Sequence, residues 1–190
     1  MEEAKKAFVV DTSIAKSASP AKDEDAATDA SLCYQFLLSI FNDDGFHVVM
    51  SLDMYAEWDR HVLKPDEQPE FNRHTHQWFV EMVRSDRVID IGDVRNDKLR
   101  KKIHETSRDA GVQEMMRKDY HLLEAALEKD KIVFSRDKKV RRHYRNAAVT
   151  VEEIKLIHWA NPILPEDEVI AWLENGAFDD PKRQLGFAGT

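Results

Sequence analysis

Short apolar runs that alternate with longer amphipathic segments are the feature that most constrains the fold of this chain. Their length and their valine, isoleucine and phenylalanine content are typical of buried strands. The runs lie at 8–10, 47–50, 88–91, 132–135 and 154–159. Between them, apolar residues recur at helical spacing, for example within 32–40 and 119–130. Strands that alternate with helices in this way predict an α/β fold of three layers (α/β/α) around a mainly parallel, five-stranded sheet.

The alternation of strands and helices covers most of the 190 residues but not the end of the chain. We expect residues 1–163 to form the α/β domain. Residues 164–190 are expected to form a C-terminal helix, at about 166–176 and ended by Gly176, followed by a loose tail.

Charge and hydropathy narrow the class of protein. A net charge of −8 argues against a strongly basic nucleic-acid binder but suits an acidic site that collects divalent cations. No apolar run approaches the roughly 18 residues that a membrane span needs, and the N-terminus has no signal-like apolar core. We therefore expect a cytoplasmic protein with no membrane partner.

Two strands deliver a carboxylate to the same edge of the predicted sheet. Asp11 directly follows the run at 8–10, and Asp137 follows the run at 132–135. Because the carboxyl ends of parallel strands meet at one edge, these two side chains should lie together. Two helices can add Glu57 and Asp119 to the same edge, although Asp119 could equally cap its own helix.

Four carboxylates in one cleft repel each other strongly. At ~5 Å and an effective dielectric constant near 20, each pair costs about 3 kcal/mol. Such a cluster persists only if some protons stay on or if cations lie between the oxygens. Hard divalent ions such as Mg²⁺ or Mn²⁺ prefer oxygen ligands and leave room for phosphate, so the pattern indicates phosphoryl chemistry.

At these residues the sequence resembles the PIN domain family of metal-dependent nucleases. FVVDTSI (8–14) is similar to the opening strand of the family with its Asp-Thr-Asn/Ser signature, and YAEW (55–58) lies where the family has a helical glutamate. DYHLLEAAL (119–127) resembles the Asp-x-x-Leu-Leu-x-x-Ala helix, and FSRD (134–137) resembles the [Ser/Thr]-x-Asp turn. The order of these motifs agrees from about residue 7 to 160.

The resemblance implies a PIN-like, Rossmann-related fold and a metal-dependent endonuclease. Asp11, Glu57, Asp119 and Asp137 would be catalytic and would bind one or two Mg²⁺ or Mn²⁺ ions, with Ser13 and Ser135 as polar support. The implied reaction is hydrolysis of single-stranded RNA, or of DNA in some branches, leaving a 5′-phosphate. VapC-type toxins are the largest group of the family, so the resemblance also implies a homodimer and an antitoxin or other protein partner.

A basic segment begins directly after Asp137 and is the candidate nucleic-acid contact. The side chains expected to bind phosphates are Lys138, Lys139, Arg141 and Arg142. The same segment could instead be an ordinary solvated helix face.

Other interpretations of the acidic pattern remain open. Asp53 and Asp59 are alternatives to Glu57 as the helical carboxylate of the site. A catalytically degenerate PIN fold, which would serve as a binding module, is an alternative to the nuclease. A haloacid-dehalogenase-type phosphatase needs a second aspartate two positions after the first, where this chain has Ser13. A response-regulator receiver needs an acidic pair just before the strand of its phosphorylated aspartate, and Glu2 and Glu3 come too early.

Overall fold

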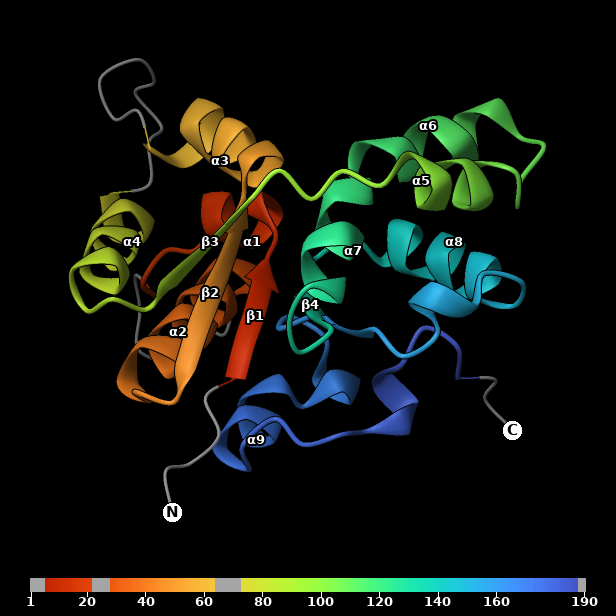
Figure 1. Cartoon of the computed structure of the whole chain (residues 1–190). Helices are drawn as coiled ribbons and strands as arrows, with labels where there is room; N and C mark the ends of the chain where they lie inside the picture. The colour runs from red at the N-terminus through yellow and green to blue at the C-terminus, as the bar shows by residue number, and fades with distance from the viewer. Residues whose placement is uncertain (1–5, 22–27, 64–72, 188–190) are drawn as a thin grey trace.

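A computed structural model describes residues 6–21, 28–63 and 73–187 of the chain (Figure 1). The strands are β1 (Lys6–Val10), β2 (Phe46–Ser51), β3 (Val88–Gly92), β4 (Ile132–Phe134) and β5 (His158–Ala160). The α-helices are α1 (Thr12–Ser17), α2 (Asp29–Asn42), α3 (Leu52–Trp58), α4 (Arg73–Arg84), α5 (Asp97–His104), α6 (Ala110–Lys118), α7 (Tyr120–Leu127), α8 (Lys138–Ala148) and α9 (Val169–Glu174). Short turns of other helix types are η1 (Asp59–Leu63, π-helical) and the 3₁₀ turns η2 (Glu152–Ile154), η3 (Pro165–Asp167) and η4 (Pro181–Arg183).

All five strands lie in one parallel sheet with the order β3-β2-β1-β4-β5. This confirms the predicted α/β class and parallel sheet. β2 and β3 are added on one side of β1, and β4 and β5 are then added on its other side. Open α/β sheets bind ligands in the crevice beyond the strand ends at such a reversal of order. The fold therefore points to the carboxyl ends of β1 and β4.

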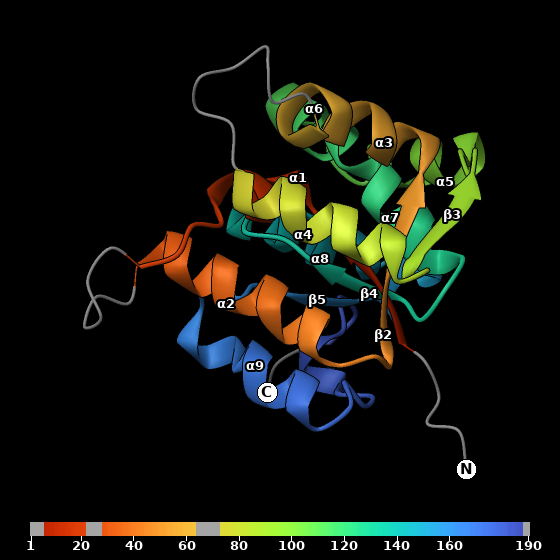
Figure 2. The ribbon, with the colours of Figure 1, turned by 90° about the vertical axis from the view of Figure 1, so that its left-hand side faces the viewer.

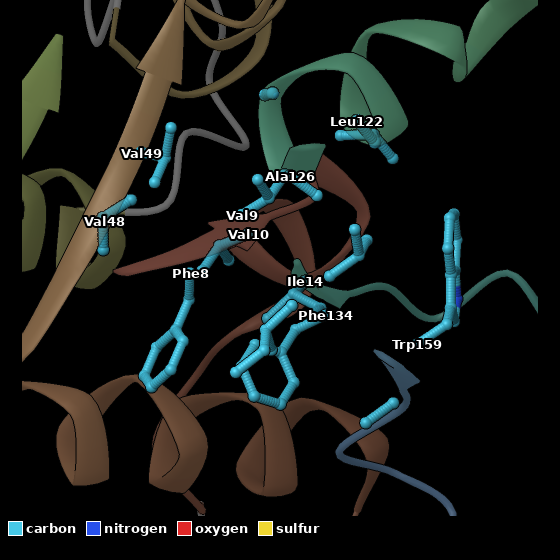
Figure 3. Packing of buried hydrophobic residues seen from close by; sticks show 14 of the residues in the cluster. Phe8, Val9, Val10, Ile14, Val48, Val49, Leu122, Ala126, Phe134 and Trp159 are labelled. Carbon is cyan, nitrogen blue, oxygen red and sulfur yellow. The ribbon is translucent and has the colours of Figure 1, made fainter. Parts of the chain in front are cut away.

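Aromatic side chains fill the space between the sheet and α2. The Phe134 ring is fully buried and lies 4.6 Å from the Phe36 ring of α2 and 5.3 Å from that of Phe8. Figure 3 shows Phe8 and Phe134 pointing toward the helix on one side of the sheet, with Leu122 and Ala126 of α7 on the other. The sheet is thus covered on both faces.

Further helices extend these two layers. α2 and α9 lie side by side on one face, as Figures 1 and 2 both show, and Trp172 of α9 reaches the Phe134 ring at 5.9 Å. On the other face, the ring of Tyr144 from α8 packs 5.4 Å from that of Trp159, and its hydroxyl donates to the Met116 carbonyl at 2.8 Å. These contacts fix α8, and hence its N-terminus, against the sheet.

The predicted strand at 154–159 is wrong in its position. Residues 152–154 form η2, and β5 covers only His158–Ala160. The side chains of Ile154 and Ile157 are both fully buried, and their spacing of three is that of a helical turn. A short apolar run cannot by itself distinguish a buried turn from a buried strand.

The predicted C-terminal helix is shorter than expected, and the predicted loose tail is packed. α9 begins at Val169 because Glu168 has left-handed backbone angles (φ 38°, ψ 45°) that separate η3 from α9. Gly176, at φ +81°, follows α9 as expected for a helix end. Beyond it Leu185 is buried and its N–H donates to the Ile157 carbonyl at 2.9 Å. Residues 188–190 of the predicted tail lie outside the described residues.

Among the described residues, none of the helices combines the length and the apolar character that crossing a membrane requires.

Replacing Phe134 tests whether the aromatic layer beneath the sheet holds the fold together. We expect Phe134→Ala to lower the free energy of unfolding by about 3–5 kcal/mol, because it removes a fully buried ring with three aromatic neighbours. Phe134→Leu should cost roughly 1–2 kcal/mol because most of the volume is kept. Urea unfolding followed by circular dichroism measures both, and equal losses for the two variants would contradict this packing.

Candidate functional site

Asp11 occupies the point where β1 and β4 end side by side. Its backbone N–H donates to the Phe134 carbonyl at 2.9 Å, which extends the pairing of the two strands by one residue. The hydroxyl of Ser135, which follows β4, donates to Asp11 Oδ2 at 2.6 Å, and both side chains are buried. The carboxylate is therefore fixed at the reversal point of the sheet by groups from both strands.

Asp11 also caps helix α1, so that the same side chain is both a helix cap and a candidate site residue. Its Oδ1 accepts from the Ser13 N–H at 3.1 Å, and its Oδ2 accepts from the Ser13 hydroxyl at 2.5 Å. Hydrogen bonds to a carboxylate favour its charged form. Ser13 and Ser135, which were expected to be polar support of the site, both hydrogen-bond to Asp11.

Glu57 reaches the same edge from α3 but has its own partners. The Thr12 hydroxyl donates to Glu57 Oε1, and His121 Nε2 lies 3.0 Å from Glu57 Oε2. Burial opposes the charged imidazolium, yet the contact with Glu57 and the charges of Asp119 and Asp11 outweigh it, so that the pKa of His121 is raised. The carboxylates around His121 therefore favour the charged form of its imidazole.

Asp119 differs from the other three carboxylates in its hydrogen bonding. It precedes α7 as an N-cap residue, but within the described residues its side chain makes no capping hydrogen bond. Burial raises its pKa to about 7; the charges of Asp11, Glu57 and Asp137 act in the same direction, and His121 opposes them. The interpretation of Asp119 as a simple helix cap is wrong, and Asp119 lies close enough to the other three predicted carboxylates for their charges to act on it.

Asp137 is a helix cap as well as a neighbour of Asp119. Its Oδ1 accepts from the N–H groups of Lys139 and Val140, both at 2.8 Å. Its own N–H donates to the Ser135 hydroxyl at 3.2 Å. Ser135 therefore links Asp137 to Asp11 within one hydrogen-bonded turn.

A cavity of about 530 Å³ opens beside Glu57, Asp119 and His121. Basic side chains share its lining with these groups: Arg60, Arg100, Arg117 and Lys118. Glu57 and Asp119 thus share the lining of this cavity with the four basic side chains, which we call the cationic rim. Such a lining can attract a metal ion to the carboxylates and a phosphate ester to the basic side chains.

Two of the rim arginines are held by carboxylates. Arg100 donates to the buried Glu124 at 2.6 Å and to Asp53 at 3.0 Å, and Arg117 donates to Glu114 at 2.8 Å. Asp53, the alternative to Glu57, is therefore paired with an arginine at the cavity wall.

The predicted phosphate contacts after Asp137 divide into two groups. Lys138, Arg141 and Arg142 line a second cavity, on the side of α8 that faces the C-terminal segment. Lys139 is exposed, and only its backbone N–H is tied to Asp137.

The carboxylates of the site suit a hydrated divalent cation better than one that the protein ligates directly on several sides. Within residues 6–21, 28–63 and 73–187, no three His, Cys, Asp or Glu side chains are grouped so that they could hold a metal ion directly. Mg²⁺, however, keeps several waters and is commonly bound through one or two carboxylates together with substrate phosphates. Asp119, half-buried near three other carboxylates and without a capping hydrogen bond in the described structure, has the chemistry that such an ion requires.

Several residues of the site were not predicted from the sequence. Thr12 and His121 both contact Glu57, and Arg100, Arg117 and Lys118 line the cavity from the region 92–118. His121 could have been noticed in the sequence, because it lies in the first turn of α7, two residues after Asp119. The arginines had no such signal, since their position depends on how α5 and α6 fold over the sheet edge.

Comparisons with known protein families, with curated proteins and with solved structures gave no match to this chain. Its function is therefore argued from the geometry and chemistry of the site.

The raised pKa of Asp119 predicts how stability depends on pH. Above pH ~4 the unfolded chain releases this proton, whereas the folded protein keeps it up to about pH 7. The Asp119 carboxyl therefore lowers stability progressively as pH rises between these values. In EDTA, Asp119→Asn should raise the free energy of unfolding by about 1–3 kcal/mol at pH 7 and by almost nothing at pH ~3.

Urea unfolding at several pH values measures this difference. Glu128→Gln, which removes one exposed negative charge at the opposite edge of the sheet, is the matched control and should show no such pH dependence. A pH-independent effect of Asp119→Asn would mean that the carboxyl titrates normally.

Proposed function

We propose that this protein is a PIN-like, Mg²⁺- or Mn²⁺-dependent endonuclease that hydrolyses phosphodiester bonds of single-stranded nucleic acid, RNA in the first place. The observation that carries the proposal is the raised pKa of Asp119, which lies at the N-terminus of α7 near Asp11. Burial raises this pKa, the charges of Asp11, Glu57 and Asp137 act in the same direction, and the cationic rim lines the cavity beside Asp119. An excess of buried negative charge of this kind is stabilised by cations.

The residues of the site would have different roles in this reaction. Asp11 and Asp119 are the residues that would hold the cation, Asp11 because two serine hydroxyls fix its orientation. The Glu57–His121 pair lies beside them and sets the charge of the cavity wall. When bound, a divalent ion of this kind supplies an activated water and stabilises the leaving oxygen of the phosphodiester.

The cationic rim accounts for substrate binding by a chain with a net charge of −8. Arg60, Arg100, Arg117 and Lys118 surround the cavity, and Arg100 is oriented by Glu124. A guanidinium group can donate two parallel hydrogen bonds to the oxygens of one phosphate. Contacts of this kind bind the sugar-phosphate backbone of a nucleic acid and do not depend on its bases. The rim therefore supports binding of either RNA or DNA.

A cleavage assay tests the proposal. A 5′-labelled single-stranded RNA, and a DNA of the same sequence, should be cut with Mg²⁺ or Mn²⁺ and should stay intact with EDTA. Asp11→Asn and Asp119→Asn should each lower the rate by at least ~100-fold, because metal activation of water is worth several kcal/mol. Glu128→Gln should cut like the parent, and full activity of Asp119→Asn would contradict the mechanism.

A catalytically degenerate binding module is the second candidate. One observation favours it: Asp11 caps α1, Glu57 is paired with His121, and Asp137 caps α8, so that three of the four carboxylates have structural partners. A module of this kind would bind the labelled strand in EDTA and in Mg²⁺ equally and would leave it uncut.

A further inference from the structure

One face of helix α8 carries a stripe of basic residues. Lys138, Arg141, Arg142 and Arg145 follow the spacing i, i+3, i+4, i+7, which places them on the same side of the helix. The stripe begins at the residue after Asp137 and runs about 10 Å along the helix axis. It therefore leads away from the candidate site and toward the C-terminal segment.

The C-terminal segment closes this face into a cavity of about 600 Å³. The basic stripe forms one wall, and residues of η3 and η4 form the other, where Lys182 and Arg183 add two cations. The cavity therefore depends on residues beyond 163, which the predicted α/β domain did not include.

Only part of this positive charge is neutralised by ion pairs. Arg141 Nη1 lies 2.6 Å from Asp167 Oδ2, and Arg183 Nε lies 3.0 Å from Asp180 Oδ2. Within the described part of the chain, the cations of the cavity that form no ion pair are Lys138, Arg142, Arg145 and Lys182. The remaining carboxylates of the lining, those of Glu166 and Glu168, are exposed.

Two arginines of the stripe also have unused donors. Arg141 Nε and Arg145 Nε are buried and donate to no acceptor in the described structure. Arg141 is about nine-tenths buried, with 11% of its side chain exposed. Burial, followed by the charge of Arg141, lowers the pKa of Arg145. Neighbouring half-buried arginines that keep buried N–H groups without acceptors are the setting in which a bound anion satisfies both charge and hydrogen bonding.

We propose that this cavity binds a phosphate group of the nucleic-acid strand, at a position separate from the bond that is cut. The inference rests on the proposed nuclease function and adds a second anchoring point for its substrate. Arginine forks match phosphate oxygens, and the stripe connects the cavity directly to Asp137. The C-terminal segment thereby becomes part of the substrate-binding surface.

Strand binding in EDTA tests the inference without requiring cleavage. The pocket variant is Arg142→Ala/Lys182→Ala, which removes two exposed side chains that form no ion pair in the described structure. Its affinity for a labelled single-stranded RNA should fall about 10-fold. The slope of log affinity against log salt should become shallower by about 1.4, at 0.7 for each lost phosphate contact.

The matched control is Arg108→Ala/Lys129→Ala, which removes one arginine and one lysine that are exposed and lie outside this cavity. It should bind like the parent. Thermal melting of both double variants within a few degrees of the parent verifies that they fold. Equal affinities and salt slopes for the pocket variant and the control would overturn the inference.

A second experiment with inorganic phosphate distinguishes binding of a nucleic-acid strand from binding of a small free anion. If phosphate stabilises the parent but not the pocket variant while strand binding is equal in both, the cavity takes a small anion and the proposal is wrong. A pocket variant that loses strand affinity although the parent cuts neither RNA nor DNA would keep this inference and reject the nuclease function.

Discussion

The hydrogen bond between the Ser135 hydroxyl and Asp11 Oδ2 joins the two halves of the structure at the point on which the proposed site depends. It lies where the strand order reverses, between one half built on β1 and β2 and the other built on β4 and β5. Because Asp11 also caps α1 and Ser135 also accepts from the Asp137 N–H, one carboxylate orients the first turns of two helices. The site is therefore anchored in the backbone of the fold rather than in flexible loops.

The four carboxylates around this hydrogen bond differ in the partners that compensate their negative charge. Asp11 accepts from serine hydroxyls, Glu57 contacts a histidine with a raised pKa, and Asp137 accepts from two backbone N–H groups. Within the described residues the Asp119 side chain makes no capping hydrogen bond, and burial raises the pKa of its carboxyl to about 7. The burial that makes Asp119 costly in the metal-free protein is the same feature that would favour a bound cation.

The sequence predicted the fold class and the edge of the sheet because both follow from local patterns. The runs at 8–10 and 132–135 match β1 and β4 to within a few residues, and Asp11 and Asp137, which follow them, both hydrogen-bond to Ser135. β5 was misplaced because buried turns and buried strands share one hydrophobic pattern. The Glu57–His121 contact, the cationic rim and the cavity over α8 arise from segments distant in sequence, and no local pattern encodes them.

The central claim is that the Asp11–Asp119 edge holds a divalent cation. Crystals soaked in Mn²⁺ and measured at the manganese absorption edge test it directly, because the anomalous signal locates the ion without reference to activity. The account predicts a peak at the carboxyl ends of β1 and β4, bound to Asp11 or Asp119 directly and to the remaining carboxylates directly or through water. Mn²⁺ bound only elsewhere, with these carboxylates unchanged, would contradict it.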